Sequence, residues 1–198
     1  MDTKDRILKA ALQLYNQKGI DVVTTRHIAA SISISPGNLH YHFKHTDDII
    51  TALYARLAAG FDQEMKKIGS GGHIDMDRIL DLAACSFKLM DHYRFIFLHF
   101  VEIAARIPAI GANYRQLMAG RTKEFVKLFR QLVRNGTFRA DLKSTVWPAL
   151  VKQLFIVADF WLSHNELTSR LRGREAELAY RDTFKMLFLP FLKPHSGT

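Results

Sequence analysis

A stretch of small polar side chains offers the clearest candidate chemistry in this sequence. Residues 24–43 read TTRHIAASISISPGNLHYHF. Hydroxyl, amide, imidazole and phenol groups with little bulk suit hydrogen bonds to base edges and phosphates in a DNA major groove. We expect these contacts from the outward side chains of the second half of the stretch: Ser35, Gly37, Asn38, His40, Tyr41 and His42. Gly37 also lets the backbone approach DNA closely.

Two short helices joined by a tight turn must position these groups. Thr24 is a good N-cap for a helix that runs to about Ser31. Ser35 followed by Pro36 is typical of an N-cap and a first helical residue, so a second helix begins there. Residues 32–34 form the turn between them. This arrangement predicts a helix-turn-helix.

Apolar residues at helical spacing are expected to hold this pair together. Ile28, Ala29 and Ile34 pack between the two helices, and the small Ala29 suits a close crossing. Leu39 and Phe43 are four residues apart, so they lie on one face of the second helix. We expect them to anchor that helix on the helix that opens the domain.

The first 55 residues or so resemble the DNA-binding domain of the TetR family of transcriptional regulators. The resemblance rests on these residues, followed by an acidic start to the next helix: Ile7, Ala10, Ala11, Leu14, Tyr15, Gly19, Thr24, Thr25, Ile28, Ala29 and the string Ser35-Pro36-Gly37-Asn38-Leu39-His40-Tyr41-His42-Phe43-Lys44. The combination is specific. The remainder of the chain resembles the variable helical domain of the family in length and helix count only.

The resemblance implies that the helix from Ser35 enters the major groove. It implies DNA contacts for these residues: Thr25, Arg26, Ser35, Gly37, Asn38, His40, Tyr41, His42 and Lys44. The usual Ala-Gly-Val turn of the family is Ser31-Ile32-Ser33 here. Without the glycine, another residue of the turn must adopt an uncommon backbone conformation. His40 stands where the family often has tyrosine, so the base preference does not transfer.

Helical periodicity continues along the chain, which predicts an all-α protein. We expect a helix-turn-helix DNA-binding domain at 1–47, joined to the start of a connecting helix that reaches about 62. An effector-binding and dimerisation domain is expected at 48–198. Its helices are expected at 46–68, 75–91, 95–106, 114–134, 147–162 and 175–192, with Thr46 as the first cap and chain breaks at Pro108 and Gly111.

Residues 85–106 have the composition of a small-molecule pocket. A largely apolar helix carries His99, Glu102 and Arg106 at i, i+3 and i+7, and such pockets combine apolar walls with a few polar groups. In the resembling family, an effector bound in the large domain changes the spacing of two DNA-reading heads. Further candidates by position are Phe61, Met65, Phe87, Met90 and Trp147. The alternative is ion pairing for the polar residues and core packing for the others.

The last two helices carry more apolar surface than one small bundle readily hides. A helix that is apolar nearly all round must be covered on more than one side. We expect this pair to form an interface with a second copy of the chain through these residues: Leu154, Phe155, Ala158, Trp161, Leu162, Tyr180, Phe184, Leu187, Phe188 and Phe191. The alternative is that they form the core of a monomer.

Composition narrows the classes of protein without locating a site. The 198 residues carry a net charge of +9, spread along the chain, which permits nucleic-acid binding. A single cysteine, Cys85, excludes an intrachain disulfide framework and a Cys-based zinc finger. We expect no metal or cofactor. No secretory signal or membrane span is found, so a cytoplasmic protein is expected.

Together with the resemblance to the TetR family, these observations favour a homodimeric, sequence-specific transcriptional repressor that a small effector releases from DNA. Its expected partners are a palindromic double-stranded DNA operator, a second copy of the chain, and a small apolar effector. Two alternatives remain open at this stage. One is a constitutive DNA-binding dimer without an effector. The other is an enzyme on a helical scaffold, for which the sequence shows no catalytic motif.

Overall fold

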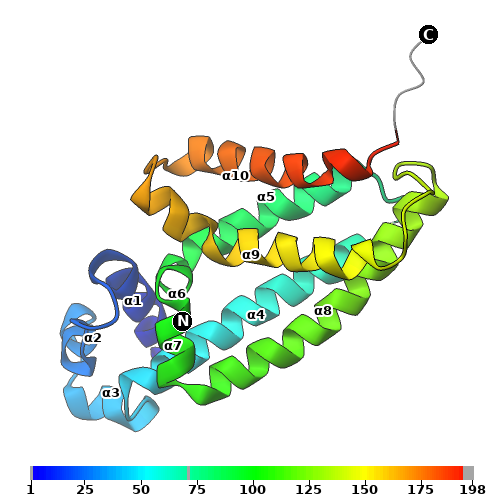
Figure 1. The fold of residues 1–198 in the computed structure, drawn as a ribbon. Coiled ribbons are helices and arrows are strands. Elements are labelled where there is room, and N and C mark those ends of the chain that lie inside the picture. Colours follow the sequence, from blue (N-terminus) through cyan, green and yellow to red (C-terminus); the bar gives the residue numbers. More distant parts are fainter. Residues whose placement is uncertain (1, 71, 194–198) are drawn as a thin grey trace.

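A computed structural model describes residues 2–70 and 72–193 of the chain. This part of the chain forms ten α-helices and one short 3-10 helix, with no β-strand (Figure 1). The elements, in order, are α1 Thr3–Lys18, α2 Thr25–Ser31, α3 Pro36–His42, α4 Thr46–Ser70, α5 Met76–His92, α6 Arg94–Leu98, α7 Phe100–Arg106, α8 Pro108–Arg134, α9 Val146–Leu167, α10 Gly173–Phe188 and η1 Leu189–Phe191. The prediction of an all-α protein is confirmed.

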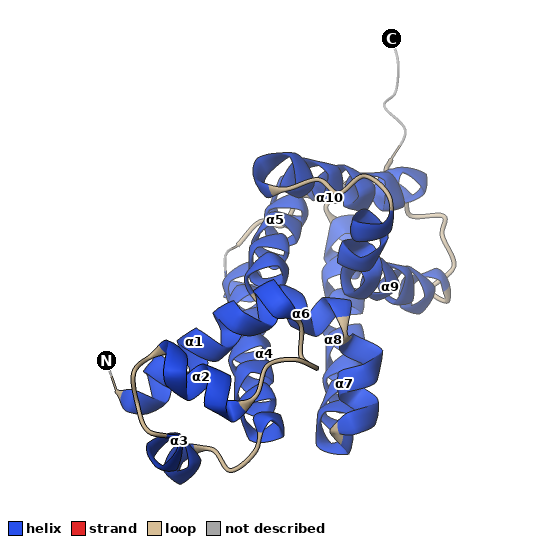
Figure 2. Cartoon of the chain, turned by 90° about the vertical axis from the view of Figure 1, so that its left-hand side faces the viewer, coloured by secondary structure: helices blue, strands red, loops and turns tan. Residues whose placement is uncertain are grey.

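The helices α1, α2 and α3 form a small head at one end of the molecule (Figures 1 and 2). The Thr24 hydroxyl accepts a hydrogen bond from the His27 backbone N–H at 3.3 Å, which caps α2 as predicted. The Ser35 hydroxyl accepts one from the Asn38 backbone N–H at 3.2 Å and caps α3. Both helix starts therefore lie where the cap residues place them.

In the turn between α2 and α3, a residue other than glycine adopts an uncommon backbone conformation, as predicted. Ser33 has a φ of 55°, in the left-handed region. This conformation lets the Ile34 backbone N–H donate to the Ala29 carbonyl at 3.1 Å. The turn therefore closes without the glycine that the family usually places there.

The long helix α4 leads from the head into the larger helical part (Figure 1). There α5 packs against α4 and α10, and α9 packs against α6, α8 and α10. By length and composition alone, α9 could cross a membrane. One such helix is only weak evidence of a membrane span, because the core helix of a soluble protein passes the same test. The buried residues of α9 include Asp159 and Asn165, and they pack within this bundle.

Three predicted features between 95 and 111 are wrong. The expected single helix at 95–106 is interrupted at His99, with φ −119° and ψ 23°, and so becomes α6 and α7. Pro108 begins α8 instead of breaking the chain, because a proline at the first helical position lacks only an N–H that would be unpaired there. Gly111 lies buried inside α8, where an added Cβ would meet the Ala104 carbonyl of α7 at 3.4 Å.

Two helix ends also differ from the prediction. Thr46 does not cap α4 but is its first residue, and the Asp48 carboxylate accepts a hydrogen bond from the His45 backbone N–H at 2.9 Å instead. α10 ends at Phe188 and continues as η1, because Pro190 has no N–H to sustain the α-helical hydrogen bonds.

Candidate nucleic-acid interface and internal cavity

α3 has one buried face and one exposed polar face. Leu39 and Phe43 are buried against the head, as predicted. Gly37, Asn38 and His40 are exposed, and the Tyr41 side chain is 86% exposed although it is large and partly apolar. α3 lies at the outer end of the head (Figure 2). The exposed face is therefore shaped for a polar partner rather than for the core.

The other predicted DNA-contact residues flank this face. His42 is half-buried, and its ring packs edge-on against Tyr41 at 5.2 Å between centroids. Thr25 and Lys44 line one hollow beside the start of α4, and Arg26 is exposed on α2. Ser35, besides capping α3, remains exposed. The predicted set therefore lies on α2, α3 and the residues next to them, and most of its members are exposed.

Sequence reasoning missed a cation near the end of α3. The Lys4 ammonium of α1 lies 5.6 Å from the centroid of the Phe43 ring, within the range of a cation–π contact. A lone lysine in the first turn of an amphipathic helix gives no signal of this in the sequence.

Arg106 joins the larger part of the molecule to the start of α4. Its Nη2 lies 2.6 Å from Asp47 Oδ1 and donates a hydrogen bond to the Thr46 hydroxyl at 3.1 Å. His99 instead pairs with Glu102, with 3.2 Å between Nδ1 and Oε2. These three predicted pocket residues do not line the cavity described below.

Asn16 provides a second link, which sequence reasoning did not find. Its side-chain amide donates to the His92 carbonyl at 2.8 Å, and its amide oxygen accepts from the Phe95 backbone N–H at 3.0 Å. The rings of Tyr15 and Phe95 are 5.0 Å apart between centroids. α1 of the head is therefore attached directly to the junction of α5 and α6.

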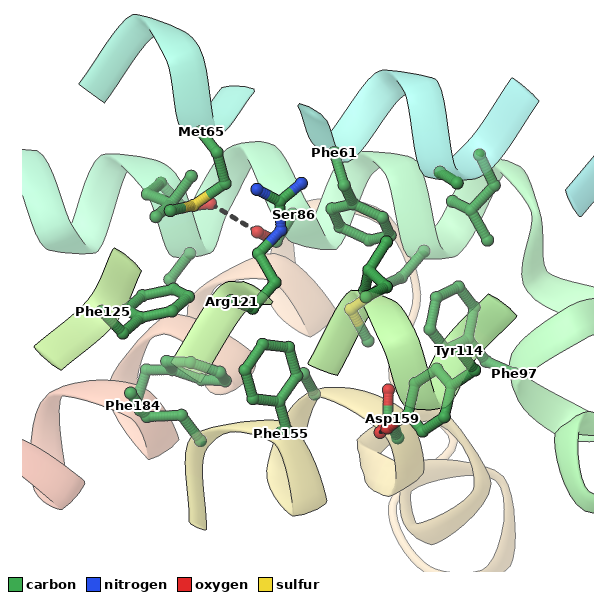
Figure 3. Close-up of a pocket in the computed structure, with 18 of the residues that line it drawn as sticks. Phe61, Met65, Ser86, Phe97, Tyr114, Arg121, Phe125, Phe155, Asp159 and Phe184 are labelled. Atoms are coloured by element: carbon green, nitrogen blue, oxygen red, sulfur yellow. Dashed lines mark hydrogen bonds between the residues drawn. The ribbon is translucent and has the colours of Figure 1, made fainter. Parts of the chain in front are cut away.

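A cavity of about 120 Å³ is lined by residues from each of the helices α4 to α10 (Figure 3). Three of the predicted pocket residues line it, namely Phe61, Met65 and Met90. Phe87 does not, because it packs against Trp161 and Tyr180 at 5.7 and 5.5 Å between ring centroids. Further walls come from residues that were not predicted for the pocket: Tyr54, Phe97, Phe100, Tyr114, Leu117, Arg121, Phe125 and Asp159.

Trp147, another predicted pocket residue, lies in a separate aromatic cluster. Its ring stacks on Phe138 with 5.8 Å between centroids and packs against Phe191 at 5.9 Å. This cluster joins the start of α9 to the end of α10. Trp147 is therefore a core residue of the protomer.

The cavity contains a buried carboxyl group. Asp159 is 9% exposed and accepts a hydrogen bond from the Tyr114 hydroxyl. Burial raises the pKa of Asp159 to about 6, and the hydrogen bond from Tyr114 opposes part of that rise. The Tyr180 hydroxyl, from α10, is buried without a hydrogen-bond partner.

The structure places most of the predicted interface residues inside the protomer. The buried residues of this set are Leu154, Trp161, Leu162, Tyr180, Phe184 and Phe188. Phe155 and Ala158 are half-buried and line the cavity, while Leu187 and Phe191 are half-buried against the core. The inward faces of α9 and α10 therefore cover the cavity. The apolar side chains that remain exposed on these helices are Ile156, Phe160, Leu167, Leu178 and Met186.

Comparisons with known proteins agree with this arrangement. Residues 7–53 match the family model described as "Bacterial regulatory proteins, tetR family", and residues 56–197 match the one described as "Bacterial transcriptional repressor". The probable HTH-type transcriptional regulator YttP of Bacillus subtilis is 29% identical over 157 residues, which span 78% of this chain and 74% of YttP. The HTH-type transcriptional repressor KstR2 of Mycolicibacterium smegmatis is 22% identical over 70% of this chain and 69% of KstR2.

A solved structure extends the likeness over nearly the whole chain. The crystal structure of a TetR-family transcriptional regulator from Marinobacter aquaeolei VT8 superposes with a TM-score of 0.88 and 25% identity, covering 98% of this chain and 93% of that one. Members of this family are DNA-binding transcriptional regulators and not enzymes. The helical head, the large helical part and both family matches lead to one conclusion: the chain belongs to the TetR family of bacterial transcriptional regulators.

Proposed function

We propose that this transcriptional regulator is a homodimeric repressor that reads a palindromic operator with α3 and leaves it when a small effector enters the cavity. The observation that best supports DNA recognition by α3 is that this helix has one buried face and one exposed polar face. Leu39 and Phe43 fix the helix to the head, and Asn38, His40 and Tyr41 face outward. Side chains held in this way reach base edges and phosphates.

Exposed apolar side chains on α9 and α10 support the dimer. Ile156 and Phe160 are one helical turn apart on α9 and are 55% and 45% exposed. Leu178 and Met186 on α10 are 45% and 62% exposed. A monomer rarely leaves large apolar side chains gathered on neighbouring helices. A two-fold dimer through this face would present two heads about 34 Å apart to successive turns of one groove.

The cavity supports control by an effector. Ile96 and Phe97 of α6 belong to its walls, and the next residue toward the head, Phe95, is hydrogen-bonded to Asn16 of α1. A ligand that displaces α6 therefore acts on α1 through a direct contact. We propose the head at 1–47 as the DNA-binding domain and 48–198 as the effector and dimer domain. A protein with this role works in the cytoplasm, where its operator is.

Selection from a pool of random duplex DNA tests DNA reading. Competitor DNA and about 0.15 M salt suppress purely electrostatic binding. The wild-type protein is expected to enrich a palindromic site, and a Tyr41→Ala/Lys44→Ala variant of equal thermal stability is expected to enrich none. Arg130→Ala, an exposed arginine on α8 away from the head, is the matched control. Retention without an enriched site would instead support the constitutive binder, and no retention would contradict the proposal.

A further inference from the structure

The walls of the cavity are aromatic and apolar except at a few points. Phe61 and Phe97 pack edge-on at 6.5 Å between ring centroids, and Phe125 and Phe155 do so at 5.8 Å (Figure 3). The volume of about 120 Å³ is of the same order as an engineered apolar cavity of roughly 150 Å³ that accepts benzene. The body of a ligand that fits without rearrangement is therefore apolar and about the size of one aromatic ring.

Asp159 is the acidic centre of this cavity, and phenol groups from three other helices surround it. Tyr114 of α8 donates a hydrogen bond to it. Burial raises the pKa of Tyr54 of α4 and of Tyr180 of α10, and the nearby Asp159 carboxylate raises both pKa values further. These phenols stay neutral across the physiological range. Among the residues that the structure describes, no lysine, arginine or histidine forms an ion pair with Asp159.

Arg121, the cation in the cavity wall, is already engaged. It forms ion pairs with Asp62 of α4 and Glu124 of α8, the latter with 2.6 Å between Nη1 and Oε2. Two carboxylates therefore compensate one guanidinium. With Asp159, the charges around the cavity are more negative than positive, so a ligand carboxylate finds no uncompensated cation there.

Resting on the proposed effector-controlled function, we propose that the effector is an apolar amine, whose ammonium group binds the Asp159 carboxylate while its ring or rings fill the aromatic part of the cavity. The ammonium group would supply the missing counter-charge, and the neighbouring aromatic faces favour a cation. The unpartnered Tyr180 hydroxyl offers a further hydrogen bond. An apolar carboxylate would bring a second negative charge toward Asp159 and is rejected.

Binding of three compounds of nearly equal size to the full-length protein tests this ligand class. 2-Phenylethylamine, 2-phenylethanol and phenylacetate share one ring and differ in head-group charge, and their naphthyl counterparts form a larger series. Calorimetry at pH 7.5 measures the affinity of each compound. In at least one of the two series, the amine is expected to bind at least tenfold tighter than the carboxylate of the same series. Equal or tighter binding of the carboxylate, or no amine binding at 5 mM in either series, would overturn the proposal.

Variants separate charge recognition from the shape of the cavity. Asp159→Asn is expected to weaken amine binding at least tenfold and to leave alcohol binding within threefold, which also shows that the cavity is intact. Asp182→Asn, the same change at an exposed position of α10, is the control and should change nothing. Asp62→Asn/Glu124→Gln leaves Arg121 uncompensated and is expected to improve carboxylate binding. Unchanged amine affinity in Asp159→Asn would contradict the proposal that Asp159 binds the ammonium group.

The pH dependence gives an independent readout. Asp159 is expected to change charge between pH 5 and 7.5, because burial raises its pKa to about 6, whereas the pKa values of Tyr54, Tyr114 and Tyr180 are raised above their usual value. Amine affinity is expected to rise severalfold over this interval in the wild type and to stay flat in Asp159→Asn. Equal pH profiles for the two proteins would contradict the assignment.

A DNA-release assay distinguishes this proposal from the proposed function. Release of the selected operator by the amine, and not by phenylacetate, would support both. Amine binding without release would leave the amine site standing and contradict its role as the effector site. Release by phenylacetate alone would support effector control and overturn the amine class.

Discussion

Arg106 at the end of α7 and Asp47 in the first turn of α4 form an ion pair with 2.6 Å between Nη2 and Oδ1. The same guanidinium also donates to the Thr46 hydroxyl. Because only three residues separate α3 from α4, this pair ties the large helical part to the end of α3, the helix that we propose reads DNA. α7 therefore contacts the start of α4 directly, in addition to being joined to it along the chain.

Removing this pair should weaken the communication between cavity and head. In Arg106→Ala we expect the effector concentration for half-release of operator DNA to change severalfold, while DNA affinity without effector changes less than threefold. The loss of stability should be small, about 0.2–1 kcal/mol, since both side chains are partly exposed. Fluorescence anisotropy with labelled operator measures both quantities. Arg139→Ala, which breaks an exposed pair with Asp141 outside the head, should leave release unchanged.

Lys44 should contribute to DNA affinity through phosphate contact alone. Lys44→Ala is expected to weaken binding to the selected site and to unrelated DNA by similar factors, because a lysine–phosphate contact carries no base information. The slope of log affinity against log salt should fall by about one. Titrations between 0.05 and 0.2 M salt measure this slope. A loss confined to the selected site would instead assign Lys44 to base reading.

Asp159 should make the folded state less stable at neutral pH than in mild acid. Its pKa rises from 3.8 in the unfolded chain to about 6 in the folded protein, so the folded state holds a proton between these values that the unfolded chain has released. Protonation of Asp159 therefore raises the free energy of unfolding as the pH falls through 6 toward 4. The gain is about 1.5 kcal/mol between pH 7.5 and 5.

Urea unfolding at these two pH values measures the effect. Asp159→Asn is expected to be more stable than wild type at pH 7.5 and to lose this part of the pH dependence, because asparagine keeps the acceptor for Tyr114 and carries no charge. Asp182→Asn should follow the wild-type profile. A lower stability of Asp159→Asn at pH 7.5 would show that the ionised carboxylate is well accommodated.

The exposed apolar face of α9 and α10 should be the dimer contact. Phe160→Glu and Met186→Glu each place a charge on this face and should convert the dimer to a monomer with little change in helical content. Light scattering coupled to size exclusion reports the mass. Val101→Glu, at an exposed position of α7, is the control. Dimers that persist in a double variant at micromolar concentration would place the interface elsewhere.

The head could be predicted from the sequence because its determinants are local. Thr24, Ser35 and Pro36 set helix starts through bonds to residues within one turn, and Leu39 and Phe43 share a face by helical geometry alone. The turn at Ser33 follows from the same local reasoning, since one residue there had to accept a positive φ.

The cavity and the links to the head were decided by the tertiary structure. Asp159 and Tyr114 are 45 residues apart, and Asn16 and Phe95 are 79 apart, so no periodicity in the sequence joins them. Arg106, a predicted pocket residue, lies outside the cavity and pairs with Asp47 of α4, which is 59 positions earlier in the chain. The sequence pattern does not distinguish the buried apolar residues of α9 and α10 from the exposed ones. Only packing decided which of them, such as Tyr180, are buried in the protomer, and which, such as Met186, remain exposed.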